Sequence, residues 1–333
     1  MSLSSFNRVI GRRRTPLIER VSDILSRVED HQLRSILATE VICSWMVAPI
    51  QNVDDWIMRG RESLVKANDP SQEVKFYNIV GRYYHLHNDK VKALQFYDIA
   101  FKFADKLVDG VLQGTVRDSL AMVQWSVGNY SHGRQLAHEA VQCARIKSDL
   151  HLEAVATRTE AMCCAGLGDF SHSAYLCARS RELLALCGLR GGTVNLLVSI
   201  TEADVLLRKT EYAESRKIYA AMAREISPEH SPYEYAIALL NLATLDINMG
   251  ASANTIRQNL NSAKAIVEGQ SPSMCFSCDA TLADLELRKG HPGTAKPTLE
   301  RIYSTTRWAA VLLGVKDVAR VASRLRAVAN PDM

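Results

Sequence analysis

Apolar residues recur along most of the chain at helical spacing, in stretches separated by short polar turns. In one such stretch Leu120, Val123 and Val127 fall on one stripe of a 3.6-residue period, beside Ala121. The turn that follows begins with Gly128. Glycine adopts the left-handed conformation that ends a helix without a Cβ penalty, and Asn or Asp suits the start of the next helix. Each stretch and its turn therefore predict a hairpin of two helices.

This hairpin pattern occurs six times, at a nearly constant spacing of 40, 40, 42, 40 and 40 residues. The turn residues that set this spacing are Asn88, Gly128, Gly168, Thr210, Gly250 and Gly290. A small residue stands seven places before each turn: Gly81, Ala121, Ala161, Ala203, Ala243 and Ala283. A second, mostly small set stands five places after each turn: Ala93, Gly133, Ser173, Ser215, Thr255 and Ala295. A fixed period of this length indicates a solenoid of helical units that stack to form one core.

The small residues and the aromatic residues near the turns predict how the helices touch. Helix axes approach to about 8–10 Å only where the contact point carries no bulky side chain. The two helices of a hairpin are therefore expected to meet at the small positions. Tyr130, Phe170 and Tyr212 follow three of the turns and are expected to fill the gap between successive hairpins.

The order of small residue, turn glycine, aromatic residue and small residue resembles the tetratricopeptide repeat, whose usual period is 34 residues. Here the helices of one repeat are longer by about one turn in total. The resemblance implies an all-α fold, a right-handed α-solenoid of tetratricopeptide-like hairpins with a period of about 40 residues. In such a fold the chain forms one elongated domain, which excludes most enzyme folds.

Several phrases within the repeats are more specific than the repeat pattern alone. They are GNY at 128–130, EAMCC at 160–164, LLALCG at 183–188, ALLNLA at 238–243 and LADLELR at 282–288. Together they resemble the helical repeat arm of fungal STAND-type NTPases, over residues 73–310. In that family the arm follows a nucleotide-binding domain and senses a ligand or partner. The phosphate-binding motif G-x-x-x-x-G-K-[ST] is missing here, so the resemblance implies an arm without its NTPase domain, either a stand-alone relative or a truncated copy.

The composition changes outside the repeats. Residues 1–17 contain Arg8, Arg12, Arg13 and Arg14 and no acidic residue. They predict a basic, disordered arm, with mitochondrial or nuclear targeting as the alternative. Residues 18–72 contain helical patterns at 18–28 and 33–45 and predict an N-terminal helical cap or irregular repeat. Residues 73–310 hold the six hairpins, and residues 311–333 predict a C-terminal capping helix and tail.

The overall composition fits a helical repeat protein. Apolar residues make up 47% of the 333 residues but aromatic residues only 7%, as expected for helices packed through Ala, Leu and Val. A formal net charge of +4 is too small to indicate nucleic acid as a partner. The eight cysteines fall in the predicted helices or at their ends, which favours reduced thiols in the cytoplasm over a disulfide framework. No apolar run approaches the ~18–20 residues needed to span a bilayer.

Motifs that could carry catalysis or bind a metal are weak. Cys275 and Cys278 have the spacing of two zinc ligands, but no second pair accompanies them. The repeat register places both on a helix, where packing in the core is the favoured interpretation. His85 occupies the register position of Trp125 and is expected to pack inside the repeat. Because no G-x-S-x-G elbow is present either, we predict no catalytic, cofactor or metal site, the alternative being an enzyme with an unmarked active site.

The resemblance to tetratricopeptide repeats also implies an inner groove, lined by the first helix of each hairpin at places ten and six before the turn. The pairs at these places are Asn78 with Arg82, Asp118 with Met122, Arg158 with Met162, Ile200 with Asp204, Leu240 with Thr244, and Ala280 with Asp284. Each pair is four residues apart and so shares one helix face. The candidates for partner contact are Asn78, Arg82, Asp118, Met122, Arg158, Met162 and Asp204.

The function predicted from these residues is a non-catalytic scaffold that binds a protein or peptide. Arg82 and Arg158, together with two methionines, would suit an acidic, partly apolar peptide or a partner helix. An ordinary solvated face, with Met122 and Met162 at the edge of the core, is the alternative interpretation. The family resemblance implies a second function, a detached sensor or regulatory arm that acts with STAND-type NTPases.

Overall fold

A computed structural model describes residues 27–44, 53–87, 89–189, 193–229, 231–268 and 271–308. Within these ranges the chain forms fourteen helices and no strand, so the predicted all-α solenoid is confirmed. The basic arm, most of the helical pattern at 18–28, the turn residue Asn88 and the C-terminal segment 311–333 lie outside the described residues.

The helices form seven consecutive hairpins. Their bounds are α3 (His31–Ser44) and α4 (Val53–Ala67), α5 (Pro70–Leu86) and α6 (Lys90–Ala104), α7 (Gly110–Ser126) and α8 (Tyr130–Ile146), α9 (Leu150–Leu167) and α10 (Phe170–Leu186), α11 (Thr193–Arg208) and α12 (Tyr212–Glu225), α13 (Pro232–Asn248) and α14 (Ala253–Val267), and α15 (Pro272–Arg288) and α16 (Pro292–Trp308).

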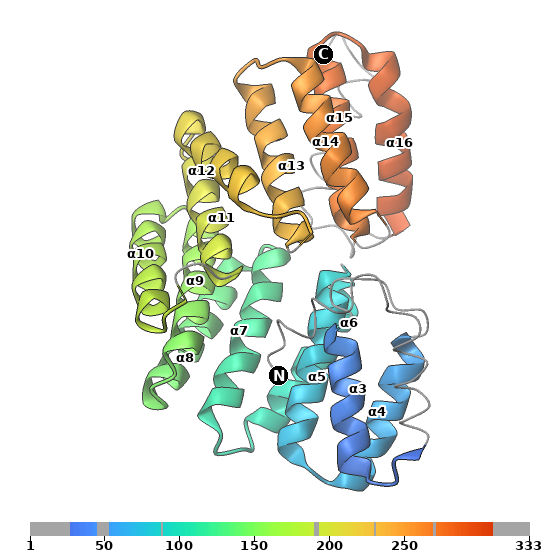
Figure 1. The fold of residues 1–333 in the computed structure, drawn as a ribbon, viewed down its shortest axis with the longest axis vertical. Coiled ribbons are helices and arrows are strands. Elements are labelled where there is room, and N and C mark those ends of the chain that lie inside the picture. Colours follow the sequence, from blue (N-terminus) through green and yellow to red (C-terminus); the bar gives the residue numbers. More distant parts are fainter. Residues whose placement is uncertain are drawn as a thin grey trace.

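The hairpins follow one another in a curved row, with the green hairpins at the left of Figure 1 and the blue and orange ends at the right. The first helix of each hairpin packs on the first helix of the next, from α3 on α5 to α13 on α15. A second helix packs instead on its own partner and on the first helix that follows, as α8 does on α7 and α9. Because the first helices approach one another more closely than the second helices do, they line the inner side of the curve.

Aspartates begin many of the helices. Asp69, Asp109 and Asp149 precede α5, α7 and α9, and each carboxylate accepts hydrogen bonds from backbone N–H groups of the first turn. Asp169 does the same for α10, whereas Asn129, which precedes α8, makes no such side-chain bond. These carboxylates satisfy N–H groups that have no partner within the helix. The expectation that Asp or Asn follows the hairpin turn and starts the next helix is confirmed for Asp169, whereas the aspartates before α5, α7 and α9 were not predicted.

The turns inside the hairpins use the left-handed conformation that the sequence predicts. Gly128 and Gly168 have φ of +88° and +87°, and Thr210 takes the same place with φ of +63°. A non-glycine residue in this region carries a steric cost. Thr210 therefore shows that the hairpin geometry is imposed by packing as well as by local preference.

The two sets of small residues face each other in the three central hairpins, those of α7 and α8, α9 and α10, and α11 and α12. The hydroxyl of Ser173 donates to the carbonyl of Ala161 at 2.7 Å, and Ser215 donates to the carbonyl of Ala203 at 2.8 Å. In the hairpin of α7 and α8, a Cβ added to Gly133 would lie 3.1 Å from the carbonyl oxygen of Ala121. The recurring small residues are thus the points of closest helix approach, as predicted.

One small position departs from the pattern. Thr255 is exposed, and Ile256 is buried in its place. The cause is the start of α14, which lies three residues after Gly250, whereas α8 begins two residues after Gly128. One extra residue before a helix rotates its buried face by about 100°.

Tyr130, the aromatic residue after the turn at Gly128, contacts the following hairpin. A Cβ on Gly166 of α9 would lie 2.4 Å from the ring of Tyr130, which opens α8. The ring therefore occupies the space that the glycine leaves free. For Tyr130 the expected place between successive hairpins is confirmed.

We expect the Ser173→Ala variant to lose about 1 kcal/mol of unfolding free energy, because the substitution removes a buried hydrogen bond to the Ala161 carbonyl. Urea denaturation followed by far-ultraviolet circular dichroism measures this loss. Ser171→Ala, at an exposed position of the same helix, is the control and should change stability little. Equal midpoints for the two variants would show that the Ser173 bond does not fasten the hairpin.

Candidate functional site

The inner side of the curve brings the predicted groove residues together on α5, α7, α9 and α11. Asn78, Asp118 and Arg158 stand ten places before their turns on three successive first helices, which pack side by side. The second row, six places before the turns, contains Arg82, Met122 and Met162. We call these six residues the inner-wall cluster.

The members of the inner-wall cluster differ in exposure. The exposed fractions of Asn78, Arg158 and Met162 are only 9%, 6% and 8%. Asp118 and Met122 are half-buried, and Arg82 is exposed. Arg158 is therefore a packed part of the wall, which sequence reasoning could not distinguish from a solvated cation.

Arg158 is held by groups on both neighbouring helices. Its Nη1 lies 3.9 Å from the sulfur of Met122 on α7, and its Nε donates to the Thr201 hydroxyl on α11 at 3.4 Å. Burial lowers the pKa of the guanidinium, and the nearby carboxylate of Asp118 opposes that shift. A buried cation of this kind requires a charged partner, and Asp118 provides it.

Asp118 is the carboxylate at the centre of the cluster. Burial raises its pKa, while a hydrogen bond with Thr159 and the positive charges of Arg158 and Arg82 act in the opposite direction. Burial has the largest effect on the pKa, so the ionised carboxylate is less stable here than in water. Additional hydrogen-bond donors would therefore stabilise the ionised form.

Three buried acceptors in this region have no hydrogen-bond partner among the described residues. They are Oδ1 of Asn78, Oδ1 of Asp118 and Oγ1 of Thr157. Arg82 also makes no hydrogen bond or ion pair within the part of the chain that the structure describes, although its charge acts on Asp118. Buried polar atoms are nearly always satisfied in proteins. The inner wall thus offers both a free cation and unsatisfied acceptors to another molecule.

A row of hydroxyl residues supports the cluster and was missed by the sequence analysis. Thr159 and Thr201 stand nine places before their turns and contact Asp118 and Arg158, respectively, on the first helix of the preceding hairpin. Each hydroxyl also donates to the carbonyl four residues earlier. The signal in the sequence is the polar set at this place, which is Ser119, Thr159, Thr201, Asn241 and Thr281.

The remaining groove candidates lie farther along the row and do not join the cluster. Asp204 accepts a hydrogen bond from Arg208 at 2.9 Å, one turn away on α11. Thr244 donates to the carbonyl of Leu240 within α13. The first row therefore carries no charge from α11 onward, since Ile200, Leu240 and Ala280 continue it.

Comparison with known proteins places this geometry in a structural class. No family model matches the chain, and no curated protein matches it in sequence. A Rap protein solved in complex with competence and sporulation factor aligns with 98% of this chain and 97% of its own, with a TM-score of 0.65 and 12% identity. NprR, solved in complex with its cognate peptide NprX, aligns with 89% of this chain and 87% of its own, with a TM-score of 0.59 and 11% identity.

The chain has the tetratricopeptide-like repeat fold. A STAND protein with a tetratricopeptide repeat sensor from Pyrococcus horikoshii shares it, with a TM-score of 0.50 and 15% identity over 74% of this chain. Only 38% of that longer chain is covered. The resemblance to tetratricopeptide repeats and to STAND-type arms is thus confirmed as a likeness of fold.

Within this tetratricopeptide-like fold, the residues considered for other chemistry are half-buried, as His85 and Cys275 are, or buried, as Cys278 is. Burial lowers the pKa of His85 to about 4, so the imidazole is neutral near pH 7, in agreement with a place inside the repeat. Cys278 of α15 is 2% exposed and belongs to a core cluster with residues of α13 and α14. The Cys275 thiol donates to the carbonyl of Val267. None of the described helices is both long and apolar enough to cross a lipid bilayer.

Proposed function

We propose that the inner wall formed by α5, α7, α9 and α11 binds an extended peptide or a partner helix, without catalysis. The observation that carries this proposal is the presence on one wall of an exposed cation, Arg82, and of Asp118. The Oδ1 atom of Asp118 lacks a hydrogen-bond donor among the described residues. A peptide supplies both missing groups, a carboxylate for Arg82 and N–H donors for Asp118 and Asn78. The structure of NprR with its cognate peptide, and that of a Rap protein with competence and sporulation factor, share the fold and support this interpretation.

The charges of the inner wall define the ligand more closely. Because Asp118 offsets the charge of Arg158 within the wall, Arg82 is the cation left for an acidic group. Met122 adds a flexible apolar surface beside it, and methionine adapts readily to varied partners. The ligand proposed is therefore an extended peptide with one acidic group and adjacent apolar side chains.

Reversal of charge at Arg82 tests the proposal. Peptides selected from a synthetic library by the purified wild-type protein should bind Arg82→Glu at least about tenfold more weakly, because an attraction becomes a repulsion. Fluorescence anisotropy measures the affinities. Lys102→Glu, a reversal on the second helix of the same hairpin, is the control and should bind as the wild type does. Equal affinity of the selected peptides for the wild type and Arg82→Glu would remove the groove as their site.

A second function is favoured by the likeness to the tetratricopeptide repeat sensor of a STAND protein. We propose, as the alternative, that the chain acts as a detached sensor or regulatory arm with STAND-type NTPases. Affinity purification followed by mass spectrometry separates the two ideas, since the regulatory function requires such an NTPase among the partners. Either activity would suit a reducing compartment such as the cytoplasm, because all eight cysteines are free thiols.

A further inference from the structure

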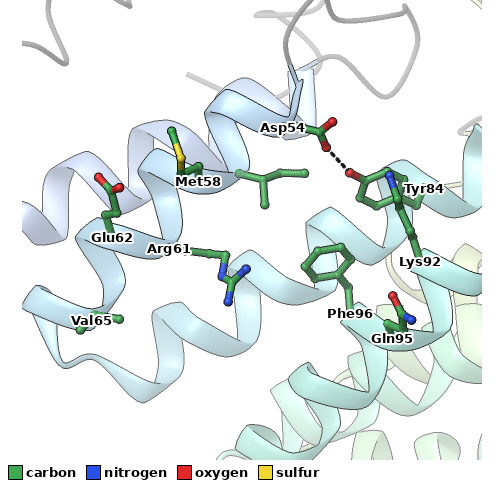
Figure 2. Close-up of a pocket in the computed structure, with 10 residues that line it drawn as sticks. Asp54, Met58, Arg61, Glu62, Val65, Tyr84, Lys92, Gln95 and Phe96 are labelled. Atoms are coloured by element: carbon green, nitrogen blue, oxygen red, sulfur yellow. Dashed lines mark hydrogen bonds between the residues drawn. The ribbon is translucent and has the colours of Figure 1, made fainter.

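A separate cleft lies on the outer side of the curve, between α4 and α6. These are the second helices of the first two described hairpins, so the cleft is distinct from the inner wall. Its volume is about 540 Å³, and Figure 2 shows the side chains that line it. No residue of the inner-wall cluster belongs to it.

The floor of the cleft is apolar and well ordered by its contacts. The rings of Tyr84 and Phe96 stack at 5.5 Å between centroids, and Ile57 beside them is 6% exposed. The Tyr84 hydroxyl donates to Oδ1 of Asp54 at 2.7 Å, a bond drawn in Figure 2. This bond connects α5 to the start of α4 and leaves Asp54 with a partner. The floor is therefore a preformed surface.

The rim of the cleft on α4 exposes apolar side chains. Met58 is 53% exposed and Val65 is 78% exposed. They are seven residues apart, so they lie on the same face of α4 about 10 Å from each other. An exposed apolar ridge beside an apolar floor is typical of a surface that binds another protein.

Two cations stand over this apolar surface. Arg61 lies between Met58 and Val65 on the same face and makes no hydrogen bond or ion pair within the part of the chain that the structure describes. Figure 2 shows its guanidinium turned toward Phe96. Lys92 of α6 lies 4.7 Å above the ring of Tyr84, with its nearest carboxylate, on Asp89, at 4.0 Å.

The two acidic residues of the cleft, Asp54 and Glu62, form no ion pair with Arg61 or Lys92 in the described structure. The carboxylate of Asp54 accepts the bond from Tyr84, and Glu62 points away from Phe96 in Figure 2. The lining thus contains two cations and two carboxylates, and Arg61 is the cation in it that forms no ion pair with the described residues, above the apolar floor. A complementary surface carries apolar side chains flanked by carboxylates.

We propose that this outer cleft binds an amphipathic helix of a partner protein, with leucine-like side chains on the floor and acidic residues facing Arg61. The length of the surface favours a helix, because the lining of α4 runs from Asp54 to Val65, about 16 Å or three helical turns. A helix that lies in a groove contacts it through residues at i, i+3, i+4 and i+7, which matches the spacing of the rim.

The probe for this site is a synthetic helical peptide with leucines at i, i+3, i+4 and i+7 and glutamates on both flanks. A second probe carries lysines in place of the glutamates. The glutamate probe should bind the wild-type protein and shift the Met58 methyl signal in NMR spectra. Arg61→Glu should weaken it by at least about tenfold, and should favour the lysine probe instead.

Matched variants distinguish the outer cleft from the rest of the protein surface. Lys66→Glu, on the same helix but outside the lining, should bind the glutamate probe as the wild type does. Arg82→Glu should also leave this binding unchanged, which keeps the test independent of the inner wall. The proposal is overturned if the glutamate probe does not bind, if it binds wild type and Arg61→Glu equally, or if the Met58 signal does not move. It is equally overturned if light scattering shows a dimer that Met58→Asp dissociates, because the face would then join two copies.

Discussion

Gly81→Leu lowers the free energy of unfolding by about 3 kcal/mol, the largest loss that we expect from a single change in an apolar region of this chain. A Cβ at Gly81 would lie 2.7–2.9 Å from three atoms of the Tyr97 ring, and Tyr97 is 1% exposed. Because the ring is almost fully buried, it can move only by displacing packed neighbours. The substitution therefore forces apart α5 and α6 at their closest point.

Leucine at this position also separates the effect of helix–helix packing on stability from the effect of helix propensity. Leucine favours a helix more than glycine does, so a loss of stability measures the contact between the helices alone. Gly293→Ala is the matched control, since a Cβ there meets no atom within 4 Å, and it should be neutral or slightly stabilising. Thermal and urea denaturation measure both variants. A Gly81→Leu protein as stable as the control would disprove the close approach of the two helices.

Arg158→Leu lowers the free energy of unfolding by a similar amount, about 3 kcal/mol near pH 7, because it leaves the carboxylate of Asp118 without its main charged partner. Adding Asp118→Asn should recover much of this loss, since the remaining polar group is then neutral. A double-mutant cycle in urea measures the coupling between the two residues. Additive losses would show that the two side chains do not interact.

The pH dependence of the same variants gives an independent check. The pKa of Asp118 is raised in the folded protein, so its contribution to stability is full below the unfolded value of about 3.9 and is lost as the pH rises through the folded pKa. Removal of Arg158 raises that pKa further. The loss caused by Arg158→Leu should therefore grow from about pH 4 to about pH 7, and this growth should vanish with Asp118→Asn.

The repeat period correctly predicted features that recur at fixed positions within the hairpins. The left-handed turn at Gly168, the contact of Ser173 with Ala161 and the place of Tyr130 all follow from residues that recur about every 40 positions. Such features depend on neighbours within one hairpin or the next. A repeating sequence encodes them because each hairpin meets the same surroundings.

The features that the sequence did not predict depend on contacts between helices or on a break in the period. Arg158 resembles any groove arginine in the sequence, and its burial follows from Met122 and Thr201 on the two adjacent helices. The shift from Thr255 to Ile256 follows from one extra residue before α14. The outer cleft lies beside α4, which precedes the six regular hairpins. The width of the cleft depends on the separation of α4 and α6, and the sequence pattern does not predict that separation.

The packing of first helices on first helices, from α3 to α15, has a mechanical consequence. Each hairpin packs internally, and neighbouring hairpins are joined both by these contacts and by the packing of each second helix on the first helix that follows. Small rotations between successive hairpins add up along the row. The curvature of the whole molecule can therefore increase or decrease while each hairpin keeps its structure. A molecule that bridges several inner helices would set that curvature, and the spacing of surfaces on the outer side would change with it.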